Sequence, residues 1–209
     1  MCNIMKIIFG TTNKRKTEDL QNIIDELKLD MEVLSMADIG WNKGEIEENG
    51  STIQENSLIK ANAILEFCID NNIYYPIITD DAGLFCESLG GEPGVYTARY
   101  ADDEILLNPQ LPKHQCVIKL LRNLKDKDNR SAEYRCCVTC MMSDGSYFQE
   151  FGESKGYISD DIIGQLKRPY FYSVFILDGY DKAFSDLNKE ELEDTYRYNA
   201  LKKTLVRIK

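Results

Sequence analysis

The sequence predicts an α/β fold built around a mixed β-sheet. In its first half, short β-branched runs alternate with segments of helical periodicity, and a hairpin pattern follows in the second half. Crossover helices connect parallel strands whereas a hairpin adds antiparallel ones, so both kinds of pairing are expected. A length of 209 residues suits one α/β domain, or two lobes that share a core, and we treat residues 1–209 as a single domain.

The N-terminal region predicts a strand, a helix and a second strand. Residues 5–10 read MKIIFG, a β-branched and aromatic run that ends in glycine and is typical of a buried strand. The apolar residues that follow recur at helical spacing and mark the core face of a helix: Leu20, Ile23, Ile24 and Leu27. A second strand is expected at residues 31–36, and residues 40–50 form an acidic loop.

A second helix and a third strand are expected after this loop. The helix spans about residues 52–71 and has an apolar stripe formed by Leu58, Ala61, Leu65 and Cys68. Residues 76–79 predict a buried strand that ends in a turn at residues 80–83, which read Asp-Asp-Ala-Gly. Residues 90–100 contain three glycines and a proline within a few positions, which indicates a tight and specific turn.

The C-terminal half predicts a helix, a hairpin, a strand and a last helix. The first helix covers about residues 113–124, and residues 131–142 and 146–152 form a hairpin around an Asp-Gly turn at 144–145. Strand character returns at residues 170–177. Asn188 is expected to cap the last helix, with Glu191 in the position that completes a capping box.

Charge and composition exclude several classes of partner. The chain has 25 basic and 35 acidic residues, so its formal charge of 25 − 35 = −10 disfavours binding to nucleic acid or to an anionic membrane surface. The sequence has no apolar run of 18 residues that would span a membrane. A nucleic-acid-binding domain is further disfavoured because no element interleaves basic and aromatic residues.

The cysteines and the single histidine exclude other chemistry. Seven cysteines without a secretory signal indicate a cytoplasmic protein with reduced thiols. Cys137 and Cys140 form a CxxC pair, but no partner pair lies at zinc spacing, so buried thiols on a strand are the better interpretation. His114 is the only histidine, which excludes a Ser-His-Asp hydrolase unless that residue lies in the site.

Three segments carry candidate chemistry, and each also has a purely structural interpretation. Residues 11–16 (TTNKRK) follow a strand and open a helix, so they predict either an anion site or a solvated basic turn with Asn13 as N-cap. In residues 52–61, Glu55 is a candidate metal ligand and Lys60 a candidate phosphate contact. However, Thr52 and Glu55 also form a T-x-x-E capping box, which explains the glutamate without any chemistry.

The third segment is Asp80-Asp81, which follows an apolar strand. One carboxylate at such a strand end could bind Mg²⁺ and the other could take a proton from water, whereas the alternative is a solvated turn. From the residues alone, the two interpretations are about equal.

Taken together and in order, four segments resemble the inosine/xanthosine triphosphate pyrophosphatase family. The family patterns T-x-N-x-x-K, T-F-x-E-N-A-x-x-K-A, D-D-S-G-L and G-G-x-P-G-x-Y-S-A-R-Y correspond here to TTNKRK, TIQENSLIKA, DDAGL and GGEPGVYTARY. Any one of these motifs is weak, but four in order form a strong signal. The similarity is good up to residue 100 and thin after it.

The resemblance implies an elongated mixed sheet flanked by helices, with two lobes and an active-site cleft between them. It implies a Mg²⁺-dependent hydrolase that splits a nucleoside triphosphate into monophosphate and pyrophosphate, and that forms a homodimer. The implied triphosphate contacts are Thr11, Asn13, Lys16 and Lys60, of which Lys60 also has a catalytic role. The implied metal ligands are Glu55, Asp80 and Asp81, and Asp81 also activates water.

The sequence departs from the family pattern in two places. Ala82 replaces the serine of D-D-S-G and removes a hydroxyl, which costs about 0.5–1.5 kcal/mol for one neutral hydrogen bond. The family's F-G-Y-D-P and S-H-R align with residues 170–174 and 195–197, so the implied base contacts become Tyr170, Tyr172, Tyr196 and Arg197. Strand core is the alternative for Tyr170, Phe171 and Tyr172, and a solvated helix face is the alternative for Arg197.

Two functions therefore remain. The first is a triphosphate pyrophosphatase whose base preference differs from inosine and xanthosine, because a tyrosine hydroxyl both donates and accepts where histidine only donates to a 6-oxo group. The second is a nucleotide-binding paralogue without turnover, which acts as a sensor or a partner subunit. The altered base segments and Ala82 favour the second, whereas Glu55, Lys60 and the Asp80-Asp81 pair favour the first.

Overall fold

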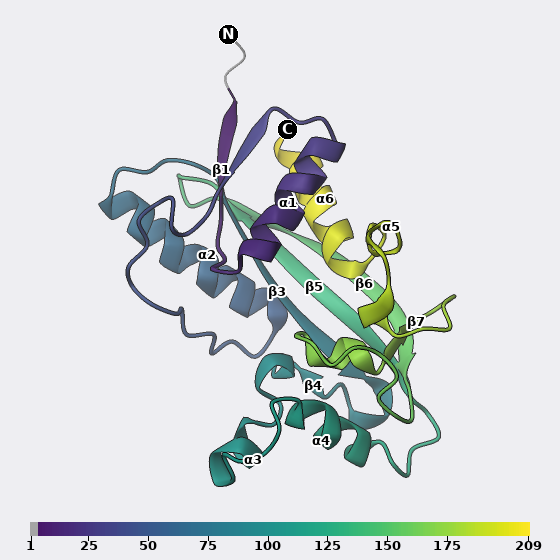
Figure 1. The fold of residues 1–209 in the computed structure, drawn as a ribbon. Coiled ribbons are helices and arrows are strands. Elements are labelled where there is room, and N and C mark those ends of the chain that lie inside the picture. Colours follow the sequence, from purple (N-terminus) through teal and green to yellow (C-terminus); the bar gives the residue numbers. More distant parts are fainter. Residues whose placement is uncertain (1–3) are drawn as a thin grey trace. The chain divides into compact units, whose positions relative to one another are not determined.

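A computed structural model describes residues 4–209, which form two compact units (Figure 1). Within these residues, the first unit contains the chain up to residue 81 together with 136–152 and 197–209. The second unit contains residues 82–135 and 153–196. Three strands, β3, β5 and β6, contribute residues to both units.

The strands form a mixed sheet, as the sequence predicts. Their bounds are β1 (Met5–Phe9), β2 (Met31–Leu34), β3 (Ile77–Cys86), β4 (Pro93–Gly94), β5 (Ser131–Met141), β6 (Tyr147–Ile158) and β7 (Phe175–Leu177). The hydrogen-bonded order is β2-β1-β3-β5-β6-β7, with β4 paired to β3. The β1 pairs with β2 and β3 are parallel, whereas the β3–β4 and β6–β7 pairs are antiparallel.

The helices also follow the predicted alternation. The α-helices are α1 (Lys14–Glu26), α2 (Ile53–Asp70), α3 (Asp102–Leu107), α4 (Gln115–Asn123), α5 (Lys189–Leu192) and α6 (Tyr196–Ile208). The short 3₁₀ segments are η1 (Glu87–Leu89), η2 (Thr97–Arg99), η3 (Tyr170–Ser173) and η4 (Phe184–Asp186). Within the described residues, no helix combines the length and the apolar character that a membrane span requires.

In the first unit, helices cover both faces of the sheet. Helix α2 packs on one face, where its residues join Ile8 of β1, Ile77 of β3 and Met141 of β5 in one buried cluster. Helices α1 and α6 lie side by side (Figure 1), and Lys202 of α6 forms an ion pair with Glu26 of α1. Of the predicted α1 core face, Leu20, Ile23 and Ile24 are buried, whereas Leu27 is half-buried and lies just beyond the end of the helix.

Strand β3 is longer than predicted, and this correction matters for the site. The expected turn at residues 80–83 does not exist, because β3 continues from Ile77 to Cys86 and its second half pairs with β4. Gly83 permits this pairing, since a Cβ atom there would lie 2.4 Å from the carbonyl oxygen of Gly94. Asp80 and Asp81 are therefore strand residues rather than turn residues.

Two predictions in the second unit are also corrected. Residues 170–177 are not one strand: η3 comes first, closed by a hydrogen bond from Ser173 Oγ to the Tyr170 carbonyl, and only β7 is extended. Asn188 and Glu191 do form a capping box, but it opens the four-residue α5 and not the last helix, α6.

The CxxC pair behaves as a structural feature of β5. Cys137 and Cys140 are buried free thiols, and burial raises the pKa of each to about 12. Both thiols therefore stay protonated at neutral pH, as is typical of structural buried cysteines. The prediction of buried thiols on a strand is confirmed.

Candidate active site

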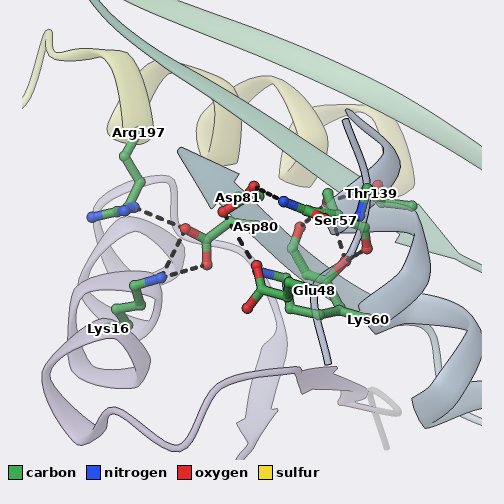
Figure 2. Close-up of polar contacts among 11 residues, drawn as sticks. Lys16, Glu48, Ser57, Lys60, Asp80, Asp81, Thr139 and Arg197 are labelled. Carbon is green, nitrogen blue, oxygen red and sulfur yellow. Dashed lines mark hydrogen bonds and ion pairs between the residues drawn. The ribbon is translucent and has the colours of Figure 1, made fainter. Parts of the chain in front are cut away.

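Asp80 and Asp81 lie on opposite sides of β3. Successive side chains of a strand point to opposite faces, and the contacts of β3 follow this alternation. Ile77 and Thr79 contact the α2 side, as does Asp81, whose partners Asn56 and Lys60 belong to α2. Asp80 faces the other way, toward α1 and α6 (Figure 2).

Asp80 is held between two cations, Lys16 of α1 and Arg197 of α6. Lys16 Nζ donates to both carboxylate oxygens at 3.0 Å, and Arg197 Nε donates to Oδ2 at 3.0 Å (Figure 2). Burial alone would raise the pKa of Asp80, but the charges of Lys16 and Arg197 hold it well below its usual range. Burial also lowers the pKa of Lys16, and the charge of Asp80 opposes that change. We call Lys16, Asp80 and Arg197 the cationic triad.

Asp81 belongs to a second charged group on the α2 side. Asn56 Nδ2 donates to Asp81 Oδ2 at 3.1 Å, and Lys60 Nζ lies 3.7 Å from Oδ1. The same ammonium donates to Glu48 Oε2 at 3.0 Å, so Lys60 bridges two carboxylates (Figure 2). We call Glu48, Lys60 and Asp81 the acidic triad.

The two triads have opposite net charge. Lys16 and Arg197 outweigh Asp80 and leave +1, whereas Glu48 and Asp81 outweigh Lys60 and leave −1. A partly exposed pair of cations suits an anion such as phosphate, and paired carboxylates suit a hard divalent cation. The arrangement can thus bind a polyanion and a metal ion on two sides of one strand.

A buried hydroxyl network fixes α2 against β3 and β5. Ser57 Oγ lies 2.8 Å from Thr139 Oγ1, and Thr79 Oγ1 donates to the Ser57 carbonyl at 2.7 Å (Figure 2). Asn56 is also buried, and its Oδ1 accepts a hydrogen bond from the Gly50 amide at 2.8 Å. These contacts fix the position of α2 along the axis of β3, so that Lys60 lies next to Asp81.

The Glu55 side chain is hydrogen-bonded to Ser51 rather than to Asp80 or Asp81, and its role as a metal ligand stays a prediction. Its Oε2 accepts hydrogen bonds from the Ser51 amide at 2.6 Å and the Ser51 hydroxyl at 2.7 Å, which lower the pKa of Glu55. Its own amide donates to Thr52 Oγ1, so Thr52 caps α2 as expected, but the Glu55 side chain bonds Ser51 instead of returning to the Thr52 amide and the capping box is only half formed. Within residues 4–209, no three His, Cys, Asp or Glu side chains gather as a site that could hold a metal ion.

Thr11 and Asn13 lie in the loop between β1 and α1. The Asn13 amide donates to Thr11 Oγ1 at 3.2 Å, and the Asn13 carbonyl accepts the Thr17 amide at the start of the helix. Ile78 pairs with Phe9, so this loop leaves β1 close to the level of Asp80 on β3. The loop and Lys16 thus belong to the same end of the first unit as the cationic triad.

The predicted base contacts Tyr170, Tyr172 and Tyr196 belong to the second unit, whereas Arg197 belongs to the first. The Tyr170 ring lies edge-on to His114, with centroids 6.5 Å apart. The hydroxyls of Tyr172 and Tyr196 are hydrogen-bonded to each other, and Tyr196 is only 2% exposed. A contact between these tyrosines and a nucleobase stays a prediction.

Tyr134 is the centre of the aromatic cluster that contains Tyr172 and Tyr196. Its ring stacks on Tyr196 at 5.0 Å and lies edge-on to Tyr172 and Phe175. The Tyr134 hydroxyl is buried and has no hydrogen-bond partner within the described part of the chain. Tyr196 therefore packs as a buried residue at the start of α6, and Tyr172 lies in a 3₁₀ turn rather than in the strand expected there.

Sequence reasoning missed Glu48 and Asn56. Asn56 precedes Lys60 by four residues, which placed both on one helix face, and this spacing was a usable signal. Glu48 is one of three glutamates in an acidic loop, and nothing in the sequence separates it from Glu45 or Glu47. Only the path of the loop over α2 brings Glu48 to Lys60.

Comparisons with known proteins agree with this architecture. The sequence model of the Ham1 family matches residues 7–206. A protein of Thermoanaerobacter pseudethanolicus named dITP/XTP pyrophosphatase is 35% identical over 201 residues, which cover 95% of this chain and 94% of that protein. A Bacillus subtilis protein with the same name is 33% identical over 204 residues, with 96% of both chains covered. The solved structure of the Staphylococcus aureus Ham1 protein superposes with a TM-score of 0.79 and 27% identity, covering 98% of this chain and 100% of that one.

The fold and the two triads define a mixed α/β protein with a charged site built around one central strand. The matches then identify its relatives: this chain belongs to the Ham1 family. The resemblance drawn from the four sequence motifs is thereby confirmed.

Proposed function

We propose that this protein is a Mg²⁺-dependent nucleoside triphosphate pyrophosphatase that releases a nucleoside monophosphate and pyrophosphate. The observation that carries the proposal is the pair of oppositely charged triads on consecutive residues of β3. Its relatives in Thermoanaerobacter pseudethanolicus and Bacillus subtilis are named dITP/XTP pyrophosphatases, which supports the same reaction class.

Glu48 and Asp81 of the acidic triad fit a magnesium ion better than the set that the resemblance implies, which is Glu55, Asp80 and Asp81. Glu48 and Asp81 supply carboxylate oxygens on both sides of one cation, the Lys60 ammonium, and their net charge favours a further positive charge. Asp80 fits poorly, because both of its oxygens already accept hydrogen bonds from cations. When bound, Mg²⁺ would offset phosphate charge and polarise a phosphoryl oxygen.

The remaining steps fall to residues of the chain itself. We assign Thr11, Asn13, Lys16 and Lys60 to the phosphate groups, where cationic and amide donors offset the charge of the leaving pyrophosphate. Water attacks the α-phosphorus, the bond to the oxygen shared with the β-phosphate breaks, and pyrophosphate leaves with that oxygen. Asp81 accepts the proton of the attacking water, and Asn56 holds its carboxylate in position.

We also propose that the base preference is broader than inosine and xanthosine. The residue aligned with the family's histidine, Tyr196, is buried and shares its hydroxyl hydrogen bond with Tyr172. Because the Tyr196 hydroxyl is already hydrogen-bonded to Tyr172, it does not select for bases that carry a 6-oxo group. A panel of nucleoside triphosphates, with pyrophosphate release as the signal, measures this preference, and exclusive hydrolysis of inosine and xanthosine triphosphates would contradict it.

The reaction itself is tested by comparing wild type with Asp81→Asn. We expect pyrophosphate, not orthophosphate, from the wild type with Mg²⁺, and a loss of turnover of at least about a hundredfold in Asp81→Asn. Glu55→Gln is the matched control: it removes an exposed carboxylate that accepts hydrogen bonds from Ser51, and turnover should persist. Saturable nucleotide binding by the wild type without Mg²⁺-dependent turnover would instead favour the nucleotide-binding paralogue.

A further inference from the structure

We propose that Asp80 is a positioning residue that holds Lys16 and Arg197 together as a two-cation clamp for the phosphate chain. The inference rests on the proposed function and deepens it in two respects. It removes Asp80 from the set of metal ligands, and it moves Arg197 from the nucleobase to the phosphates.

The three side chains of the cationic triad differ in solvent exposure, and this difference indicates which of them can contact a ligand. Asp80 is 2% exposed, so a ligand cannot reach its carboxylate directly. The side chains of Lys16 and Arg197 are 27% and 25% exposed, which leaves each partly open to solvent. Asp80 therefore acts through Lys16 and Arg197 rather than on the substrate.

The clamp joins residues that are far apart in the chain. Lys16 is in the first turn of α1 and Arg197 in the first turn of α6, 64 residues before and 117 residues after Asp80. Two cations so close together would repel each other in a buried setting without an anion between them. The buried carboxylate offsets that repulsion and fixes both head groups before a ligand arrives.

Arg197 shares its carboxylate partner with Lys16, and this places it with the phosphate contacts. The resemblance assigned Lys16 to the triphosphate and Arg197 to the base, yet both donate to Oδ2 of the same aspartate. Arginine and lysine held together provide several N–H donors and a net charge of +1 for phosphate oxygens. The same net positive charge disfavours a divalent cation at Asp80.

The full-length protein tests the proposal with two probes used separately. Inorganic tripolyphosphate with EDTA, followed by calorimetry, reports the clamp without metal or base, and Mn²⁺ alone reports the metal site. We expect Asp80→Asn to weaken tripolyphosphate binding about tenfold or more and to change Mn²⁺ affinity less than about twofold. Asp81→Asn should lose Mn²⁺ binding, and Glu55→Gln should change neither.

Two outcomes for Asp80→Asn would overturn the proposal. A carboxylate that only cancelled positive charge would oppose phosphate, so its removal would leave tripolyphosphate binding unchanged or make it tighter. A metal ligand would give a loss of Mn²⁺ affinity similar to that in Asp81→Asn. Wild-type protein that neither binds tripolyphosphate nor releases pyrophosphate would refute the proposed function itself, which is a different result.

Substitutions of the two cations, Lys16 and Arg197, provide an independent test if Asp80→Asn does not fold. Lys16→Gln and Arg197→Gln should each weaken tripolyphosphate about fivefold or more, and their effects should not add, because each loosens the same clamp. Arg197→Lys, which keeps the charge, should recover part of the affinity. If Arg197→Gln left tripolyphosphate binding intact and changed only the ratio of kcat/KM among nucleobases, Arg197 would be a base contact and the proposal would be wrong.

Discussion

Replacing Lys60 with methionine should tighten binding of a divalent cation while it abolishes most turnover. Lys60 Nζ lies 3.0 Å from Glu48 and 3.7 Å from Asp81, so the ammonium occupies the position between the two carboxylates proposed to hold Mg²⁺. Methionine keeps most of the side-chain volume and removes the charge. The acidic triad then changes from −1 to −2, and a metal ion no longer competes with an ammonium.

The size of the gain follows from the distances. A divalent ion bound at about 2.1 Å on the far side of the Glu48 oxygen, which lies 3.0 Å from Lys60 Nζ, would be at most about 5 Å from the ammonium. At that distance, repulsion between charges of +2 and +1 is about 1.7 kcal/mol in water and larger at the lower effective dielectric of a partly buried site. Taking the lower value, Lys60→Met should bind Mn²⁺ at least about tenfold more tightly.

Calorimetric titration with Mn²⁺ measures this change, and pyrophosphate release measures turnover in the same preparations. Turnover should fall at least about a hundredfold because a phosphate contact is lost. Lys182→Met is the matched control: that lysine forms an ion pair with Glu191 at 2.7 Å in the second unit, and neither quantity should change. Mn²⁺ affinity that is equal or weaker in Lys60→Met would refute the assignment of Glu48 and Asp81 as metal ligands.

Three further predictions concern stability, each measured as the free energy of unfolding in urea. The pKa of Asp80 is lower in the folded protein than its unfolded value of about 3.9. The stability that Asp80 contributes is therefore complete above that pH and is lost as the pH falls toward the folded pKa. The wild type should show this loss of stability in acid, and Asp80→Asn should not. Ser57→Ala should cost about 1 kcal/mol, because it breaks the hydroxyl contact with Thr139, and a neutral result would show that the network does not hold α2. Thr52→Ala should also cost about 1 kcal/mol through loss of the N-cap, whereas Thr52→Ser should cost much less.

The features that sequence predicted well are those with a local cause. Apolar spacing located α1, the T-x-x-E pattern located the start of α2, and the Asp-Gly pair located the turn between β5 and β6. Each of these depends on residues within a few positions of one another. The Asn188–Glu191 capping box was also correct, but it opens the short α5 rather than the last helix.

The errors arose where distant residues decide the conformation. Asp-Asp-Ala-Gly is typical of a turn, yet it is extended here because Lys16 and Arg197 neutralise Asp80 and because β4 pairs with the residues that follow. No local pattern indicated Glu48, whose contact with Lys60 depends on the path of a whole loop.

The two adjacent aspartates show why a motif does not by itself define one site. In a turn, neighbouring carboxylates can converge on one ion, whereas the assignment of both aspartates to metal came from the family resemblance. In a strand, the pleat sends them to opposite faces, so each meets a different set of helices and takes a different partner charge. Asp80 therefore meets the lysine and arginine of α1 and α6, and Asp81 meets the asparagine and lysine of α2. In the proposed reaction, a strand that separates two consecutive carboxylates therefore lets one dipeptide serve two needs, because Asp80 lies with the groups assigned to the polyanion and Asp81 with those assigned to the cation.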